Sequence, residues 1–176
     1  VNGTRFVGSS ARRGGAVRVS GGEATFRGCA FEGSSADESG GTLLVEGGEG
    51  TAVTLAAATL LRATACSAGA TIQHDGGTLR YELPAPLGRY IDSLGKVSLT
   101  LDTGAVLGDY PAVCSAGLYG GSAATEDQSS SFCAGLCAAG KVCGKATVVP
   151  RACEAGGYCP EGSPAARPCP KGRFGN

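Results

Sequence analysis

The chain has 176 residues, of which 31 are glycine, and it contains neither tryptophan nor methionine. This composition disfavours a helical bundle built on Leu and Met and favours a chain that turns often. Fifteen basic and fifteen acidic residues give a net charge of zero. No run of Lys or Arg goes beyond Arg12 and Arg13, so the electrostatic footprint of a nucleic-acid-binding protein is missing and we expect no nucleic-acid partner.

The apolar and cysteine content limits the cellular compartments in which the chain is expected. The longest apolar stretch, Ala52–Leu61, is about half of the ~20 residues that a membrane-spanning helix needs. We therefore expect membrane contact only through segments outside this sequence. Nine cysteines in a small glycine-rich chain predict an oxidising compartment, and hence a secreted or cell-surface protein. Because there is no initiator methionine and Val1 falls inside a repeat, we expect an excerpt of a longer protein.

An internal repeat occupies residues 1–75. Three motifs recur at similar offsets: FVGSSA at 6–11 as FEGSSA at 31–36, GG at 14–15 as GG at 40–41, and ATF at 24–26 as VTL at 53–55. Within each repeat the apolar residues alternate in short pieces, which predicts three short strands. Such strands cannot bury a face alone, but at a fixed period each can rest on its predecessor. The pattern predicts an all-β fold that begins with a short right-handed parallel β-helix.

Inward side chains of such a β-helix stack from coil to coil. The predicted stacks are Val17 under Leu43, Phe26 under Leu55, and Phe6 under Phe31 under Leu60. Glycine at the corners supplies the bends. A Greek-key sandwich of short strands is the alternative, and the recurrence of FxGSSA favours the coil.

The repeat motifs also carry a family resemblance. GGAVxV followed by ATF and FxGSSA resembles the repeats of polymorphic outer-membrane proteins and related surface β-helices, which typically read GGAI followed by FxxNxA. The resemblance covers residues 1 to about 75. It implies surface display and an adhesive or structural role.

Residues 76–113 are predicted to form a β cap and connector. Two alternating segments, Leu79–Leu83 and Val97–Asp102, each have one apolar and one polar face. A β-helix must cover its last apolar layer, and strands of this kind can do so. A separate small domain is the alternative, although about 45 residues is little to fold alone.

Cysteines dominate residues 114–176. They lie at positions 114, 133, 137, 143, 153, 159 and 169, and from position 137 onward the spacing and neighbours repeat at a constant interval: CAAGKVC at 137–143, CEAGGYC at 153–159 and CPKGRF at 169–174. The segment CSAGLYG at 114–120 has the same form as CPKGRFG at 169–175. We therefore expect the chain to be cut where a new module starts.

These repeats, CxxGx followed by an aromatic or apolar residue, together with CPEGSPAxxPCPxG, resemble the cysteine-rich repeats of ephrin receptor-like and tumour-necrosis-factor-receptor-like ectodomains. Tandem copies occur in large surface proteins of algae and other protists. The resemblance implies an extracellular, loop-dominated stalk in which disulfides replace a core. It also implies the pairs Cys114 with Cys133, Cys137 with Cys153, and Cys143 with Cys159, while Cys169 opens the next module and finds its partner beyond Asn176.

The two remaining cysteines lie in the repeat region. Cys29 falls at a predicted inward strand position and Cys66 in a predicted corner of a later coil. We expect both to be unpaired. Zinc is the competing use of cysteine, but only Cys133 and Cys137 have the spacing of a ligand pair, and the single histidine, His74, is far away. We expect no metal and no cofactor.

Catalytic constellations are missing from the sequence. His74 is expected to be an exposed turn residue, since its neighbour Asp75 cannot converge on it as in a catalytic triad. The enzymatic alternative is a polysaccharide-cleaving β-helix, which needs several acids near an arginine. The candidate acids occupy no common strand position in successive coils: Asp37, Glu38, Asp75, Asp92 and Asp102.

We therefore expect a non-enzymatic structural or adhesive protein of the cell surface or an extracellular filament. A ligand-binding receptor ectodomain is the alternative, followed by a polysaccharide-binding β-helix. The expected partners are other extracellular proteins or further copies of the chain, with glycans as a further class. Asn2 opens the only N-x-S/T sequon, Asn2–Thr4, and is a predicted glycosylation site.

Overall fold

The computed structural model describes residues 1–57, 59–66 and 70–170, with the backbone alone for 63–66. The chain divides into two compact units, the first formed by Val1–Pro86 and Val97–Ala112 and the second by Leu87–Lys96 and Val113–Asn176. Strands dominate the described residues, whose one helix, α1 (Thr125–Gln128), has four residues. The expected all-β, disulfide-rich class is confirmed. No described helix has the length and apolar character needed to cross a membrane.

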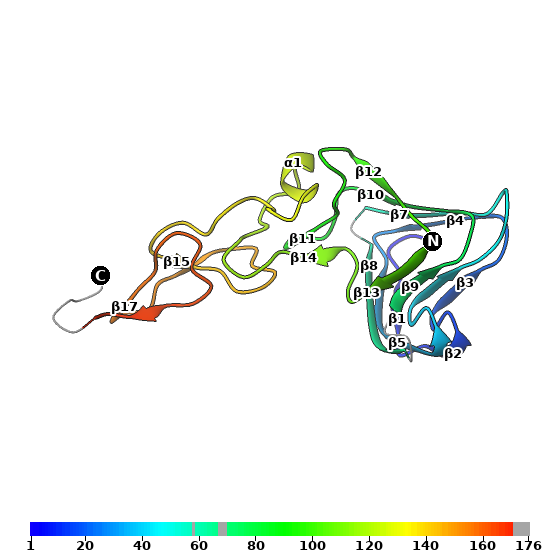
Figure 1. Ribbon diagram of the computed structural model, residues 1–176, viewed down its shortest axis with the longest axis horizontal. Coiled ribbons are helices and arrows are strands. Elements are labelled where there is room, and N and C mark those ends of the chain that lie inside the picture. The colour runs from blue at the N-terminus through cyan, green and yellow to red at the C-terminus, as the bar shows by residue number, and fades with distance from the viewer. Residues whose placement is uncertain (58, 67–69, 171–176) are drawn as a thin grey trace. The chain divides into compact units, whose positions relative to one another are not determined.

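The first unit contains three four-stranded sheets (Figure 1). The first sheet holds β1 (Arg5–Val7), β2 (Ser10–Arg13), β5 (Ala30–Ser39) and β8 (Leu60–Cys66). The second holds β4 (Glu23–Arg27), β7 (Ala52–Ala56), β10 (Thr78–Glu82) and β12 (Ser98–Leu101). The third holds β3 (Val17–Val19), β6 (Leu43–Val45), β9 (Ala70–His74) and β13 (Gly104–Leu107).

Sequence repeats supply successive parallel strands of each sheet. We define repeat 1 as residues 1–27, repeat 2 as 28–59 and repeat 3 as 60–86. In the second sheet β4, β7 and β10 pair in parallel, and in the third sheet β3, β6 and β9 do so. The predicted partners Val17 and Leu43 are in register, as are Phe26 with Leu55 and Phe6 with Phe31. These three predicted stacks are confirmed as register pairs.

The predicted stack of Phe31 on Leu60 is wrong by one residue. Ala30 pairs with Leu60, so Phe31 pairs with Leu61. The corner between β4 and β5 has two residues, 28 and 29, whereas the corner between β7 and β8 has three, 57–59. Because side chains alternate along a strand, the extra corner residue moves the buried position from Leu60 to Leu61, which is 1% exposed.

Aromatic side chains of different strands meet in the core of the first unit. Phe31 of β5 stacks on Phe6 of β1, with ring centroids 4.5 Å apart, and meets Phe26 of β4 edge-on at 5.5 Å. Phe31 is 2% exposed. Edge-on and offset contacts of this kind add to the free energy gained from burying the rings.

Two equivalent glycines make the corner that precedes the third sheet. Gly14 and Gly40 lie just before β3 and β6, and both have a positive φ, +65° and +63°. A Cβ on either would come within 2.6 Å of a backbone oxygen, that of Val17 or of Leu43. The corner therefore requires glycine in both repeats.

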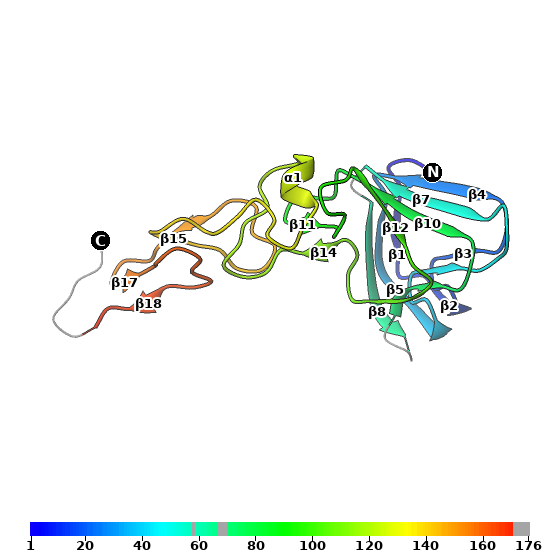
Figure 2. The same cartoon turned by 45° about the horizontal axis from the view of Figure 1, so that its top comes forward.

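Antiparallel partners close one end of the three sheets. β12 pairs antiparallel with β10, and β13 pairs antiparallel with β9. In the first sheet Leu61 and Tyr110 exchange two backbone hydrogen bonds in an isolated antiparallel bridge. Figure 2 shows β12 at one side of the second sheet and β4 at the other. Strands β9 and β13 were not predicted from the sequence.

The second unit is made of short two-stranded pairs. β15 (Lys141–Val142) pairs with β16 (Arg151–Ala152), and β17 (Gly157–Tyr158) pairs with β18 (Arg167–Pro168). β11 (Arg89–Tyr90) pairs with β14 (Ala112–Val113). Among the described residues of this unit, five of the seven buried apolar ones are cysteines, the other two being Ile91 and Val142. The unit therefore has almost no aliphatic core.

Candidate functional site

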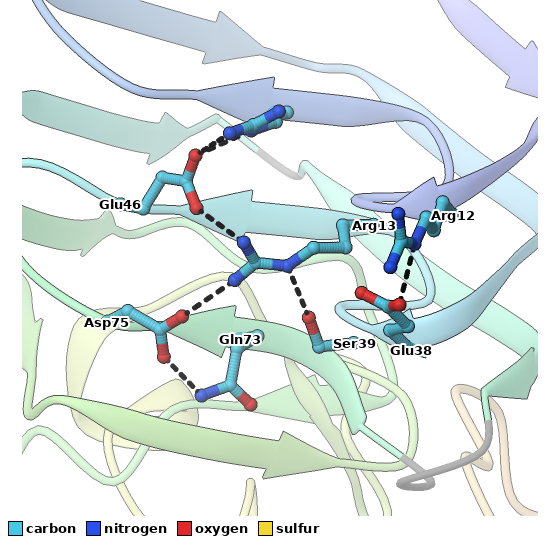
Figure 3. A network of polar contacts seen from close by, with 8 residues as sticks. Arg12, Arg13, Glu38, Ser39, Glu46, Gln73 and Asp75 are labelled. Carbon is cyan, nitrogen blue, oxygen red and sulfur yellow. Dashed lines mark hydrogen bonds and ion pairs between the residues drawn. The ribbon is translucent and has the colours of Figure 1, made fainter.

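The most developed polar cluster of the first unit surrounds Arg13, at the end of β2 (Figure 3). Its guanidinium contacts Glu46 at 3.2 Å and Asp75 at 3.3 Å, and its Nε donates a hydrogen bond to the Ser39 hydroxyl at 3.3 Å. Gln73 donates a hydrogen bond to the Asp75 carboxylate. Residues from three repeats thus meet on one arginine, because Ser39 is the register partner of Arg13 and the parallel strands β6 and β9 place Glu46 and Asp75 side by side.

Two further ion pairs flank this cluster. Arg12 contacts Glu38 at 2.6 Å, and the Nε of Arg18 donates to Glu46 at 2.6 Å. A surface groove of about 400 Å³ is lined by Arg12, Arg13, Arg18 and Glu38. Arginine matches carboxylate and phosphate groups bidentately, and each arginine that lines the groove already contacts an acid of the chain.

A separate pair, Arg5 with Glu32, joins the first two repeats on the first sheet. The hydrogen bond from Arg5 lowers the pKa of the Glu32 carboxyl below its ordinary value. The Arg5 side chain is largely exposed and that of Glu32 is half-buried, and ion pairs near the surface contribute little to stability.

Of the candidate acids, Asp75 belongs to the cluster around Arg13 and Glu38 to a pair that flanks it. Glu38 and Asp75 contact arginines, while of the candidate acids only Glu38 lines the groove. Asp102 contributes its backbone oxygen to His74, and Asp92 belongs to the second unit. Among the described residues that line the groove, Glu38 supplies the one carboxylate.

His74 is buried, and its predicted position in an exposed turn is wrong. It ends β9, where it pairs in register with Val45, itself paired with Val19, so it occupies an inward position of the third sheet. Only 2% of the residue is exposed. Its Nδ1 lies 3.1 Å from the Asp102 backbone oxygen and its Nε2 lies 3.3 Å from that of Gly77. The ring therefore lies within hydrogen-bond distance of two backbone segments beside the end of β9.

Three disulfides organise the second unit: Cys114 with Cys133, Cys137 with Cys143, and Cys153 with Cys159. The predicted bridge between Cys114 and Cys133 is confirmed, and all six predicted cysteines are bridged. The interlocked pairing, Cys137 with Cys153 and Cys143 with Cys159, is wrong. The second and third bridges are sequential, each joining cysteines six residues apart.

A tight turn explains the sequential pairing. In CAAGKVC the amide of Lys141 donates to the Ala138 oxygen at 3.0 Å, and Gly140 has a φ of +77°. In CEAGGYC the amide of Gly157 donates to the Glu154 oxygen at 3.1 Å. Each turn reverses the chain inside one module, which brings the two cysteines of that module to Cα distances of 5.8 and 5.9 Å, within the range that a disulfide spans.

The first module has the same turn but no cysteine at its end. The amide of Leu118 donates to the Ser115 oxygen at 3.1 Å, as at the equivalent positions of the later modules. Where the later modules place their second cysteine, this one has Gly120, and a Cβ there would lie 2.8 Å from the Cys114 sulfur. Cys114 therefore pairs with Cys133 instead. The sequence signal for this pairing was the spacing CxxGxxC. The two later modules have it, and the first module lacks it because residue 120 is glycine.

The other cysteines differ in environment. Cys29 is free and 1% exposed, as expected, but it lies in the corner between β4 and β5 and not in a strand. Cys169 is free and half-buried. The side chain of Cys66 lies outside the described part of the chain. Within the described residues no group of three or more His, Cys, Asp or Glu side chains is placed to hold a metal ion.

The sequential pairing predicts a specific pattern of tryptic peptides. Non-reducing digestion followed by mass spectrometry should give peptide 97–141 linked to 142–145, with peptide 152–171 linked to neither, since its own bridge is internal. Cleavage after Arg167 is not expected because Pro168 follows. Reduction should release 142–145 as the control. A covalent species containing all three peptides would restore the interlocked pairing.

Comparison of this chain with protein-family models, curated proteins and solved structures gave no match.

Proposed function

We propose that the chain is a non-enzymatic structural or adhesive module of an extracellular surface protein. In this proposal the first unit is a short right-handed parallel β-helix and the second is a disulfide-stapled stalk. Parallel strands drawn from successive repeats support the first assignment. Three disulfides in a unit with little aliphatic core support an oxidising, extracellular setting for the second.

One observation carries this proposal: charged side chains of one repeat form ion pairs with those of the next repeat. Arg5, Arg12 and Arg18 each contact an acid of the next repeat. An enzyme site instead leaves an acid, a base or a nucleophile facing a cavity. Charges arranged in this way present a regular polar surface along the repeats, as a structural or adhesive element requires.

Bead adhesion tests the proposal. Beads that carry the secreted chain are expected to adhere to the surface of cells that produce the protein, and membrane-impermeant biotin should label the protein on those intact cells. Beads carrying the reduced and alkylated chain are the matched control. Release of reducing ends from acidic polysaccharides would instead indicate a cleaving enzyme, and tight one-to-one capture of a soluble ligand without adhesion would indicate a receptor ectodomain.

Glycosylation at Asn2 is a separate prediction. Asn2 is exposed, and the Thr4 hydroxyl donates a hydrogen bond to its backbone oxygen at 3.1 Å. An exposed sequon in a secreted protein is accessible to the glycosylation machinery. Protein from the native source should lose mass on enzymatic deglycosylation, whereas the Thr4→Ala variant, which destroys the sequon, should not. An unchanged mass of the native protein would contradict this prediction.

A further inference from the structure

Strand β12 (Ser98–Leu101) is the outermost strand of the second sheet, and its outer side has no strand partner among the described residues. It lies between β11 and β13 in the chain and pairs with β10 in an unbroken antiparallel register. The strand contains no proline, no charged residue and no bulge, which are features that block further strand pairing. β13, the outermost strand of the third sheet, has a bulge between Val106 and Leu107. Of these two end strands, β12 alone therefore has an edge open to pairing.

The apolar side chains of β12 are incompletely covered. Leu99 and Leu101 are half-buried, whereas their register partners in β10, Tyr81 and Leu79, are 0% exposed. Val97, which precedes the strand, is 66% exposed. Because residues two apart share one face of a strand, the apolar side chains of residues 97, 99 and 101 lie along the same face. A further strand beside β12 would cover them.

The backbone of β12 presents donors and acceptors on its outer side. The Leu83 amide donates to the Val97 oxygen at 2.8 Å, so Leu83 and Val97 form a hydrogen-bonded pair of the ladder between β10 and β12. Such pairs alternate with non-hydrogen-bonded pairs along an antiparallel ladder. Ser98 and Thr100 therefore direct their backbone N–H and C=O groups away from β10. No described residue forms a hydrogen bond with these groups on the outer side.

We propose that β12 is a self-association edge, which pairs antiparallel with β12 of a second copy of the chain about a two-fold axis at Leu99. In this register Ser98 of each copy faces Thr100 of the other, and these are the two residues whose backbone groups are free to pair. Val97 of each copy faces Leu101 of the other, so apolar side chains lie beside apolar side chains. The second sheets of the two copies then form one continuous sheet.

Charge selects this register and this partner. Lys96 precedes β12 and Asp102 follows it in the sequence, and in the described part of the chain neither side chain has an ion-pair partner. With the axis at Leu99, Lys96 of each copy faces Asp102 of the other, which gives two pairs of opposite charge. Moving the axis along β12 places Lys96 opposite an uncharged residue. A second copy carries the complementary pattern by symmetry.

Sedimentation velocity of the full chain over a range of concentrations tests this edge. The unchanged chain should show a monomer–dimer equilibrium. Lys96→Asp and Asp102→Lys should each weaken the dimer about tenfold, because two attractive charge pairs become two repulsive ones. An equimolar mixture of the two variants should regain the association of the unchanged chain, since each chain then meets its opposite charge. The double variant, Lys96→Asp with Asp102→Lys, should also dimerise like the unchanged chain.

Lys145→Asp is the matched control, because it makes the same charge change at an exposed position of the second unit and should leave the dimer unchanged. Amide exchange at Ser98 and Thr100, measured by NMR, should slow at the concentrations that favour the dimer. Three outcomes would overturn the proposal: a chain that stays monomeric at its highest soluble concentration, a control that weakens the dimer as much as Lys96→Asp, or a mixture of the two reversals that does not regain association.

This inference rests on the proposed structural or adhesive role, for which it names a partner, a second copy of the chain. A strand of four residues gives a weak contact, and many copies arrayed on a surface or filament strengthen it through multivalency. Beads that adhere although the chain does not dimerise would overturn the self-association edge and leave the adhesive role standing. A dimer that responds to the charge reversals, formed by a chain that does not adhere, would do the reverse.

Discussion

Replacing Phe31 by Asp is expected to unfold the first unit. The side chain is 2% exposed and contacts the rings of Phe6 and Phe26. The variant loses the contacts of the ring, worth about 3–5 kcal/mol, and places an unpaired carboxylate in an apolar site at a further cost of several kcal/mol. This sum is comparable to the whole stability of a domain, about 5–15 kcal/mol. Thermal unfolding followed by circular dichroism should show loss of the cooperative strand transition.

Phe132→Asp is the matched control, because the same substitution falls on a residue that is 72% exposed. Its melting curve should coincide with that of the unchanged chain. If Phe31→Asp behaves like this control, Phe31 does not lie in the core. Phe31→Leu is a milder variant that keeps an apolar side chain and should fold with reduced stability.

The stacking of repeats was predictable because two independent signals coincide in the sequence. The alternation of apolar residues predicted the positions of β3, β4, β6 and β7. The recurrence of FxGSSA and GG predicted which residues of successive repeats are in register. Register follows from these two signals as long as the corners have equal length. The slip from Leu60 to Leu61 occurred where a corner is one residue longer, and corner length leaves only a weak mark on the apolar pattern.

Strand β9 and the burial of His74 were missed for a related reason. The strand reads ATIQH, so one of its inward positions holds a polar ring where the register partners are Val19 and Val45. The polarity of His74 favoured a turn, whereas its ring nitrogens lie within hydrogen-bond distance of the backbone oxygens of Asp102 and Gly77. Such partners come from distant or irregular segments, and a local pattern cannot identify them.

The polar cluster around Arg13 could not be predicted from the sequence, for the same physical reason. Arg13, Glu46 and Asp75 belong to three different repeats and lie far apart along the chain. Asp75 was among the candidate acids and Glu46 was not, and which acids share an arginine depends on register and corner length together. The pairs Cys137 with Cys143 and Cys153 with Cys159, in contrast, follow from the local CxxG turn, a signal that the interlocked prediction did not use.

Reduction of the disulfides is expected to unfold the second unit while the first remains folded. The bridge from Cys114 to Cys133 closes a separation of 19 residues and the other two close separations of six. In the chain-entropy account the longer bridge stabilises the folded unit by about 3 kcal/mol, and each of the shorter bridges does so by about 2 kcal/mol. In the described part of this unit, Ile91 and Val142 are the only buried apolar residues besides cysteines. Loss of the three bridges, about 7 kcal/mol in total, therefore removes most of the unit's stability.

Hydrogen exchange read by mass spectrometry distinguishes the two units in one experiment. After reduction and alkylation, amides between 113 and 170 should exchange at the rate of an unfolded chain, while those of β6, β7 and β10 keep their protection, since their order comes from strand pairing and the buried apolar layer. Replacing Cys114 and Cys133 by Ser should also cost more stability than replacing Cys153 and Cys159, because the longer loop restricts the unfolded chain more. Retained protection in the reduced second unit would mean that its turns and hydrogen bonds suffice without the bridges.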